Sequence, residues 1–159
     1  MAKERQVKAV KLKVKAVKLK NRTWYTKRLE HIACEFAKER DGYVCRHTGV
    51  KVYGSNAHAS HIIPKSAGIR FLFDIRNIKC LCMYSHLYWW HKDIKAANRW
   101  LEAFMPEFAD YTDKIANETL EINTASIAEF YELALKCKDW KEYQELFDGY
   151  MKQYIKGAL

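Results

Sequence analysis

The stretch HASHIIPKS, residues 58–66, decides how the chain is interpreted. Two histidines stand three positions apart, and an apolar Ile-Ile-Pro run follows the second. The enclosing segment YVCRHTGVKVYGSNAHASHII (43–63) has β-branched and aromatic runs interrupted by Thr-Gly and Gly-Ser-Asn, which predicts two short strands joined by a turn. In such a strand, His58 and Ser60 share one face. His61 is then either a histidine of the core or a base that takes a proton from water.

Helical patterns flank this segment on both sides. The apolar stripe within residues 22–41 ends at Asp41-Gly42, which is a typical helix stop. Further helices are predicted at about residues 83–91, from the capping Asp93 through Met105, and at about residues 126–137 and 139–155. The order helix, β-hairpin, helix and helical tail predicts an α+β fold.

Charge is distributed unevenly along the chain, whose formal net charge is +9. Residues 1–28 hold eleven Lys and Arg against one Glu, residues 43–100 hold nine basic and two acidic side chains, and residues 101–159 hold six and twelve. Basic blocks of this kind are typical of proteins that bind nucleic acid, and a solvated, solubilising arm is the alternative. We divide the chain into a basic arm (1–21), a central domain with flanking helices (22–105) and an acidic helical region (106–159).

Two features concern the compartment. No run of 18 apolar residues exists, so no membrane span is predicted, and the basic N-terminus lacks the apolar segment of a signal peptide. We therefore expect a cytoplasmic protein. In that compartment, the five cysteines are thiols or metal ligands rather than disulfides.

The central residues form an ordered series of short motifs. The series runs C45-x-x-T48-G49, H58-A-S-H61-I-I-P-K-S, N77, L81-C82-M-Y-S85-H86 and W89-W90-H91. Over residues 43–92 this order resembles the HNH (ββα-metal) endonucleases, whose usual pattern is a C-x-x-C pair, D-H-I-x-P, an Asn and then L-C-x-x-C-H. Within that family it looks closest to phage recombination nucleases of the NinG/Rap kind. The resemblance implies a ββα-metal core of hairpin plus helix, wrapped by N- and C-terminal helices.

The resemblance also implies a phage-encoded, metal-dependent DNA endonuclease acting in the host cytoplasm. Phosphodiester hydrolysis needs an activated water, a neutralised phosphate and a stabilised leaving oxygen, which a histidine base and one divalent cation can supply. By its place before Ile-Ile-Pro, His61 matches the family's general base, and Asn77 matches the residue that ties the hairpin loop together and orients that base. His86 matches the metal ligand, and His91 is a second ligand or a phosphate contact.

The chain departs from the family pattern at the metal site. Ser60 replaces the usual aspartate, and a serine hydroxyl is a poor metal ligand compared with a carboxylate. His58 is expected to supply the missing ligand, or else a water held by Ser60 does. The expected cofactor is Mg²⁺ or Mn²⁺, although a histidine-rich site also suits Zn²⁺ or Ni²⁺.

A second departure concerns the family's structural zinc. The two C-x-x-C pairs have become Cys45-x-x-Thr48 and Cys82-x-x-Ser85, so a four-thiolate site cannot form. No structural zinc is expected, and packing or hydrogen bonding is predicted to replace the ion. The alternative ligand set left open is Cys45, His47, Cys80 and Cys82.

DNA is the expected partner, bound through its phosphate backbone. The absence of a visible reading helix or zinc finger favours selectivity for DNA structure over sequence. One alternative is a non-catalytic nucleic-acid-binding protein with a decayed metal site, and another is a protein that docks a partner through its acidic C-terminal helices. The candidate phosphate contacts are Lys65, Arg70, Arg76, Lys79 and Lys92 in the centre, and Lys11, Lys13, Lys15 and Lys18 in the arm.

Overall fold

Helix α1 (Arg22–Arg40) confirms the first predicted helix and contacts both strands of the central sheet and the two C-terminal helices. Its N-terminus is capped by the side chain of Asn21, which accepts a hydrogen bond from the Trp24 N–H, and it ends before Gly42, whose φ of 62° continues no helix. The structure is a computed structural model that describes residues 19–157, so Lys11, Lys13, Lys15 and Lys18 lie outside the described residues. No helix within 19–157 combines the length and apolar character needed to cross a membrane.

The sheet next to α1 is an antiparallel pair of β1 (Ala57–His61) and β2 (Ile78–Cys82), in which Ser60 lies opposite Lys79. The prediction of two strands within 43–63 is therefore wrong in its pairing: that segment holds β1, the 3₁₀ turn η1 (Gly54–Asn56) and a single bridge between Val44 and Lys51. β2 was missed because four of its five residues are buried, which leaves no alternation of apolar and polar side chains to detect.

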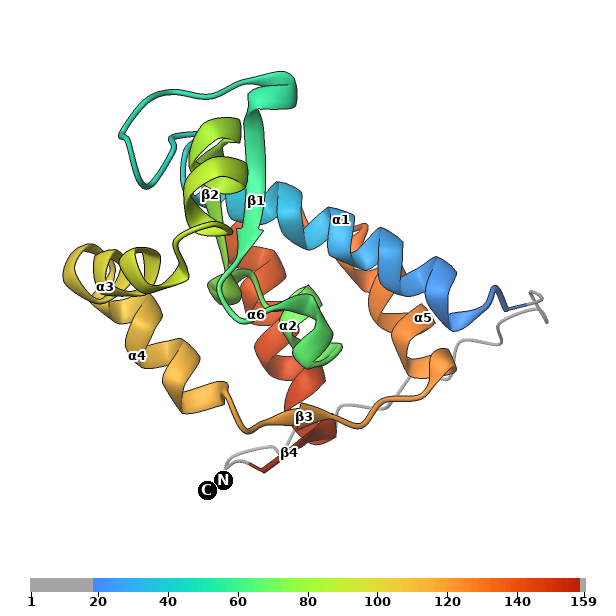
Figure 1. The fold of residues 1–159 in the computed structure, drawn as a ribbon. Helices are drawn as coiled ribbons and strands as arrows, with labels where there is room; N and C mark the ends of the chain where they lie inside the picture. Colours follow the sequence, from blue (N-terminus) through green and yellow to red (C-terminus); the bar gives the residue numbers. More distant parts are fainter. Residues whose placement is uncertain (1–18, 158–159) are drawn as a thin grey trace, which may run out of the picture.

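The connection from β1 to β2 consists of short helical pieces. They are η2 (Lys65–Ala67), α2 (Arg70–Phe73) and η3 (Ile75–Asn77). After β2, the chain turns directly into η4 (Ser85–Trp90), a π-helix at the predicted position of the second helix. An antiparallel strand pair followed at once by a helix is thus present, and α1 contacts both strands (Figure 1).

The remaining elements are helical apart from one small sheet. Helix α3 (Ile94–Phe104) is capped by Asp93 as predicted. Helix α4 (Pro106–Ile115) was not predicted, and it begins at Pro106, since proline at the first position of a helix is well tolerated. The other elements are α5 (Thr124–Ala134), α6 (Trp140–Met151), η5 (Lys152–Tyr154) and the strand pair β3 (Thr119–Leu120) with β4 (Ile155–Lys156).

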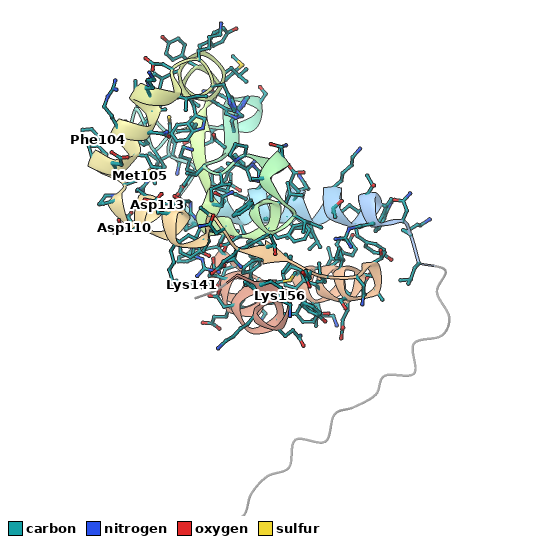
Figure 2. All side chains as sticks on the ribbon, turned by 60° about the horizontal axis from the view of Figure 1, so that its bottom comes forward. Phe104, Met105, Asp110, Asp113, Lys141 and Lys156 are labelled. Atoms are coloured by element: carbon teal, nitrogen blue, oxygen red, sulfur yellow. The ribbon has the colours of Figure 1, made fainter. Side chains whose placement is uncertain are left out.

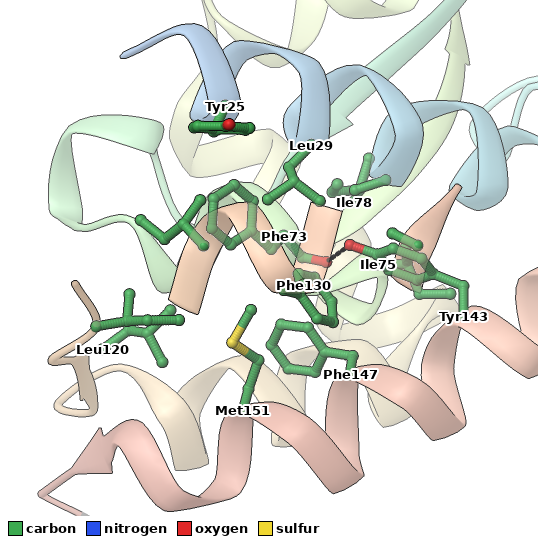
Figure 3. Packing of buried hydrophobic residues seen from close by; sticks show 14 of the residues in the cluster. Tyr25, Leu29, Phe73, Ile75, Ile78, Leu120, Phe130, Tyr143, Phe147 and Met151 are labelled. Carbon is green, nitrogen blue, oxygen red and sulfur yellow. Dashed lines mark hydrogen bonds between the residues drawn. The ribbon is translucent and has the colours of Figure 1, made fainter. Parts of the chain in front are cut away.

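Two apolar clusters hold these elements together, and the chain is α+β as expected. The larger cluster joins α1 to α5 and α6, with Leu29, Phe130 and Phe147 at its centre and a hydrogen bond of 2.8 Å from the Tyr143 hydroxyl to the Phe73 carbonyl (Figure 3). The acidic helical region 106–159 therefore shares its core with α1. Most of its charged side chains are exposed, as Asp110 on α4 is, whereas Glu118 is buried (Figure 2).

Candidate functional site

A cavity of about 500 Å³ opens beside the end of β1. Side chains from α1, the end of β1, η2, η4 and α3 line it, so several separate parts of the sequence contribute to one cavity. Its titratable lining residues are Glu30, Cys34, His61, Lys65, His86 and His91.

His61 is the last residue of β1, and its side chain is half-buried. The Nε2 atom is buried and has no hydrogen-bond partner within residues 19–157. Desolvation lowers the pKa of His61 to about 4, against the opposing charge of Glu30 and a backbone hydrogen bond at Leu72. The ring is therefore neutral near pH 7, and Nε2 is its buried nitrogen without a partner.

Asn77 holds the β1–β2 connection in place. Its fully buried side chain accepts a hydrogen bond from the Ile63 N–H at 2.8 Å and donates to the carbonyls of Ile63 and Phe71, both at 3.0 Å. Ile63 is two residues beyond His61. The amide thus fastens the segment that follows the histidine to the start of β2.

Three histidines, His58 of β1 with His86 and His91, form a row of contacts. His86 lies in η4 and His91 directly follows it, so the two are five residues apart, which is the spacing of a π-helical hydrogen bond. His86 Nε2 lies 3.0 Å from His91 Nε2, and His86 Nδ1 lies 2.9 Å from His58 Nδ1. His58 Nε2 lies 2.9 Å from the Ser55 carbonyl, which makes that nitrogen the N–H donor and leaves Nδ1 to accept from His86.

Within this row, the Nε2 atoms of His86 and His91 are the two nitrogens that could bind one cation together. Two ligands at right angles, each roughly 2.1 Å from a cation, stand about 3.0 Å apart, which matches the separation between His86 and His91 Nε2 atoms. Burial, together with the charges of His91 and His58, lowers the pKa of His86 to about 4, so this ring is neutral near pH 7. His58 then acts on His86 as an orienting partner, because its ring faces the other nitrogen of His86.

Ser60 is placed differently from the expected metal ligand. Its side chain is fully buried in the strand pair, it does not line the cavity, and its Oγ has no partner among the described residues. Opposite it, the side chain of Lys79 is also fully buried, with Nζ 3.1 Å from the centre of the Trp90 ring. Burial lowers the pKa of Lys79 well below its usual value.

Three of the five central basic candidates are structural rather than free to contact phosphate. Lys79 is buried, as described above. Arg70 is buried in an ion pair with Glu118 at 2.8 Å, and Arg76 joins Asp74 at 3.0 Å and Asp148 at 2.7 Å.

The other two basic candidates remain at the surface. Lys65 is exposed on the cavity wall and pairs with Glu30 at 2.8 Å. Lys92 is exposed after η4, with Nζ 5.3 Å from the centre of the Tyr88 ring. Their place at and near the cavity is compatible with phosphate contact.

Cys45 and Cys82, the two cysteines kept from the family's C-x-x-C pairs, both lie close to Ser85. Ser85 Oγ is 3.2 Å from Cys82 Sγ, 3.7 Å from Cys45 Sγ and 2.9 Å from His47 Nδ1. Burial raises the pKa of the Cys45 thiol, but hydrogen bonds from Thr48, Ser85 and the backbone outweigh burial and lower that pKa to about 7. A hydroxyl-centred hydrogen-bond cluster therefore occupies the position at which the resemblance implies a zinc site.

Sequence reasoning missed Glu30 and Cys34, which α1 presents to the cavity. They are four residues apart, so they share a helix face, and one ligand atom of each lies within 4.8 Å of the other and of a His61 nitrogen. In the described part of the chain, no other group of three His, Cys, Asp or Glu residues brings its ligand atoms together this closely. The i, i+4 spacing was visible in the sequence, but the approach of α1 to β1 was not.

Comparison of the chain with protein-family models, with curated proteins and with solved structures finds no significant match.

Proposed function

We propose that this chain is a metal-dependent DNA endonuclease of the HNH (ββα-metal) type. One observation carries the proposal: the free Nε2 of His61 and the paired Nε2 atoms of His86 and His91 belong to residues lining the same cavity. A neutral base and a two-histidine cation site are the two components that phosphodiester hydrolysis requires. The antiparallel pair β1–β2 followed by η4 is the strand–strand–helix order that the motif series implies.

In this proposal, His61 accepts the proton of the attacking water at Nε2. Asn77 acts as a positioning residue, because its three hydrogen bonds fix the backbone directly after His61. His86 and His91 would hold a divalent cation, which neutralises charge on the phosphate and the leaving oxygen. His58 keeps the ring of His86 oriented through their contact at 2.9 Å.

DNA is the proposed substrate, bound through phosphates rather than bases. Lys65, which lines the cavity, and Lys92, which lies near it, are the described cations best placed for these contacts. The basic residues of the arm, which lie outside the described residues, would add sequence-independent attraction that weakens with salt. Selectivity for branched or nicked DNA rests on the family resemblance.

A second candidate is a nucleic-acid-binding protein without catalysis. The burial of Ser60 favours it, because no side chain faces the cation site from the position of the family's aspartate. This candidate predicts salt-dependent DNA binding and no turnover with any metal.

The discriminating experiment incubates the full chain and its His61→Ala variant with linear, nicked, flapped and four-way DNA in Mg²⁺, Mn²⁺, Zn²⁺ or Ni²⁺. The nuclease proposal predicts cleavage by the wild type with at least one ion, and none by His61→Ala, while both proteins bind DNA equally. Cleavage retained by His61→Ala would refute the assignment of the base. Binding without cleavage by either protein would establish the second candidate.

A further inference from the structure

We propose that Glu30, Cys34 and His61 form a transition-metal site of the zinc type, separate from the His86–His91 pair, and that metal bound there inhibits the nuclease. The inhibitory half of this inference rests on the proposed function, whereas the metal site stands without it. A carboxylate, a thiolate and an imidazole are together a donor set that suits Zn²⁺ and is foreign to Mg²⁺.

The geometry brings the three donors together from two elements. Glu30 and Cys34 project from adjacent turns of α1, and His61 ends β1, which α1 contacts. One donor atom from each residue lies within 4.8 Å of the other two, close enough for small side-chain movements to close around an ion. Each of the three side chains is half-buried, so the site is neither a surface cluster nor sealed in the core.

Two further observations point to a ligand at this place. His61 Nε2 is buried without a hydrogen-bond partner in the described chain, which is costly unless something binds it. All three residues also line the cavity of about 500 Å³, which leaves room for a water as the fourth ligand of a tetrahedral ion. Lys65 pairs with one carboxylate oxygen of Glu30 at 2.8 Å, and the second oxygen remains for the ion.

Cys34 is not a reactive cysteine in the metal-free protein. Burial and the charge of Glu30 raise the pKa of Cys34 to about 12, so the free thiol is protonated and a poor nucleophile near pH 7. A bound ion would displace the thiol proton to solvent and form a metal–sulfur bond in its place. The same ion would occupy the lone pair of His61, and a histidine whose lone pair is bound to metal cannot accept a proton from water.

The inference therefore predicts opposite effects for two classes of ion. Mg²⁺ or Mn²⁺ at His86 and His91 would support cleavage, and Zn²⁺ at the Glu30–Cys34–His61 site would suppress it. Cys34→Ala removes one zinc ligand without touching the residues assigned to cleavage. Cys137 provides the matched control, since it is another half-buried cysteine and it does not line the cavity.

The test uses Co²⁺ as a spectroscopic substitute for Zn²⁺ on the full chain. We expect a sulfur-to-cobalt charge-transfer band in the wild type and in Cys137→Ala, its loss in Cys34→Ala, and its weakening in Glu30→Gln. Thermal unfolding of each variant checks that it is folded, and Cys34→Ser provides a second substitution of similar size. A band that survives in folded Cys34→Ala would overturn the metal site, because the thiolate would then come from another cysteine.

Cleavage supplies the second measurement. For each protein, the Mg²⁺-supported rate with added Zn²⁺ is divided by its own rate without Zn²⁺. Half-inhibition of Cys34→Ala should require roughly 10–100-fold more Zn²⁺ than half-inhibition of the wild type. Equal zinc sensitivity would overturn the inhibitory role. A Cys34-dependent band in a protein that cleaves no DNA with any ion would support the metal site and reject the nuclease proposal.

Discussion

Replacing Asn77 with alanine should destabilise the protein by about 3 kcal/mol. The side chain is fully buried and makes three hydrogen bonds, with the Ile63 N–H, the Ile63 carbonyl and the Phe71 carbonyl. Each contributes about 1 kcal/mol net, and the groups left behind are buried or partly buried. For a chain of this size, the loss corresponds to a fall in melting temperature of roughly 6–12 °C.

Urea unfolding followed by tryptophan fluorescence measures this change, and two further variants sharpen it. Asn77→Asp still accepts from the Ile63 N–H but sets a carboxylate against two carbonyl oxygens, so it should cost at least as much as Asn77→Ala. Asn56→Ala removes one exposed hydrogen bond, to the Met83 N–H at 2.9 Å, and should cost below about 1 kcal/mol. A loss for Asn77→Ala no greater than that for Asn56→Ala would refute the claim that Asn77 fastens the connection.

Three further predictions concern other parts of the chain. Lys79→Met should stabilise the protein by roughly 1–4 kcal/mol near pH 7. Because burial lowers the pKa of Lys79 in the folded state, the wild type gains stability as the pH rises toward the unfolded-state pKa of about 10.4. The stability difference between Lys79→Met and the wild type, measured by unfolding, should therefore shrink toward that pH. The double variant Thr48→Cys, Ser85→Cys should bind one Zn²⁺ per chain more than the wild type and gain more in melting temperature from zinc than the wild type does, whereas an equal gain would show that Cys45 and Cys82 do not face the two new thiols. Deleting residues 1–18 should leave the melting temperature unchanged and flatten the salt dependence of DNA affinity, and an unaltered slope in a titration would contradict that role of the arm.

The helices were accessible from sequence because their signals are local. Capping residues and apolar stripes identified α1 and α3, and the two C-terminal helices overlap their expected ranges, although α5 begins two residues earlier than predicted. The strand pairing was not accessible in the same way. β2 is buried on both faces and lacks alternation, and 16 residues separate it from β1, beyond the reach of a hairpin turn signal.

Some residues of the candidate site could likewise be predicted from sequence motifs, whereas others depend on tertiary packing. The resemblance of the motif series to HNH endonucleases pointed to His61, His86 and His91, which the fold brings to one cavity, and to Asn77, which fastens the segment after His61. Burial is a property of tertiary packing, and so Arg70 and Lys79 resembled surface cations although both are enclosed. Glu30 and Cys34 were missed for the same reason, because their relation to His61 exists only after α1 has packed against β1.

The most direct test of the central claim compares the initial rates at which four proteins relax supercoiled plasmid in Mg²⁺ or Mn²⁺. They are the wild type, His61→Ala, His86→Ala and His31→Ala, the last being an exposed histidine of α1 that does not line the cavity. Loss of the base or of a cation ligand should slow cleavage by at least roughly 10²-fold, and His31→Ala should match the wild type. Equal rates for His61→Ala and His31→Ala would contradict the claim that this cavity holds the base of a nuclease.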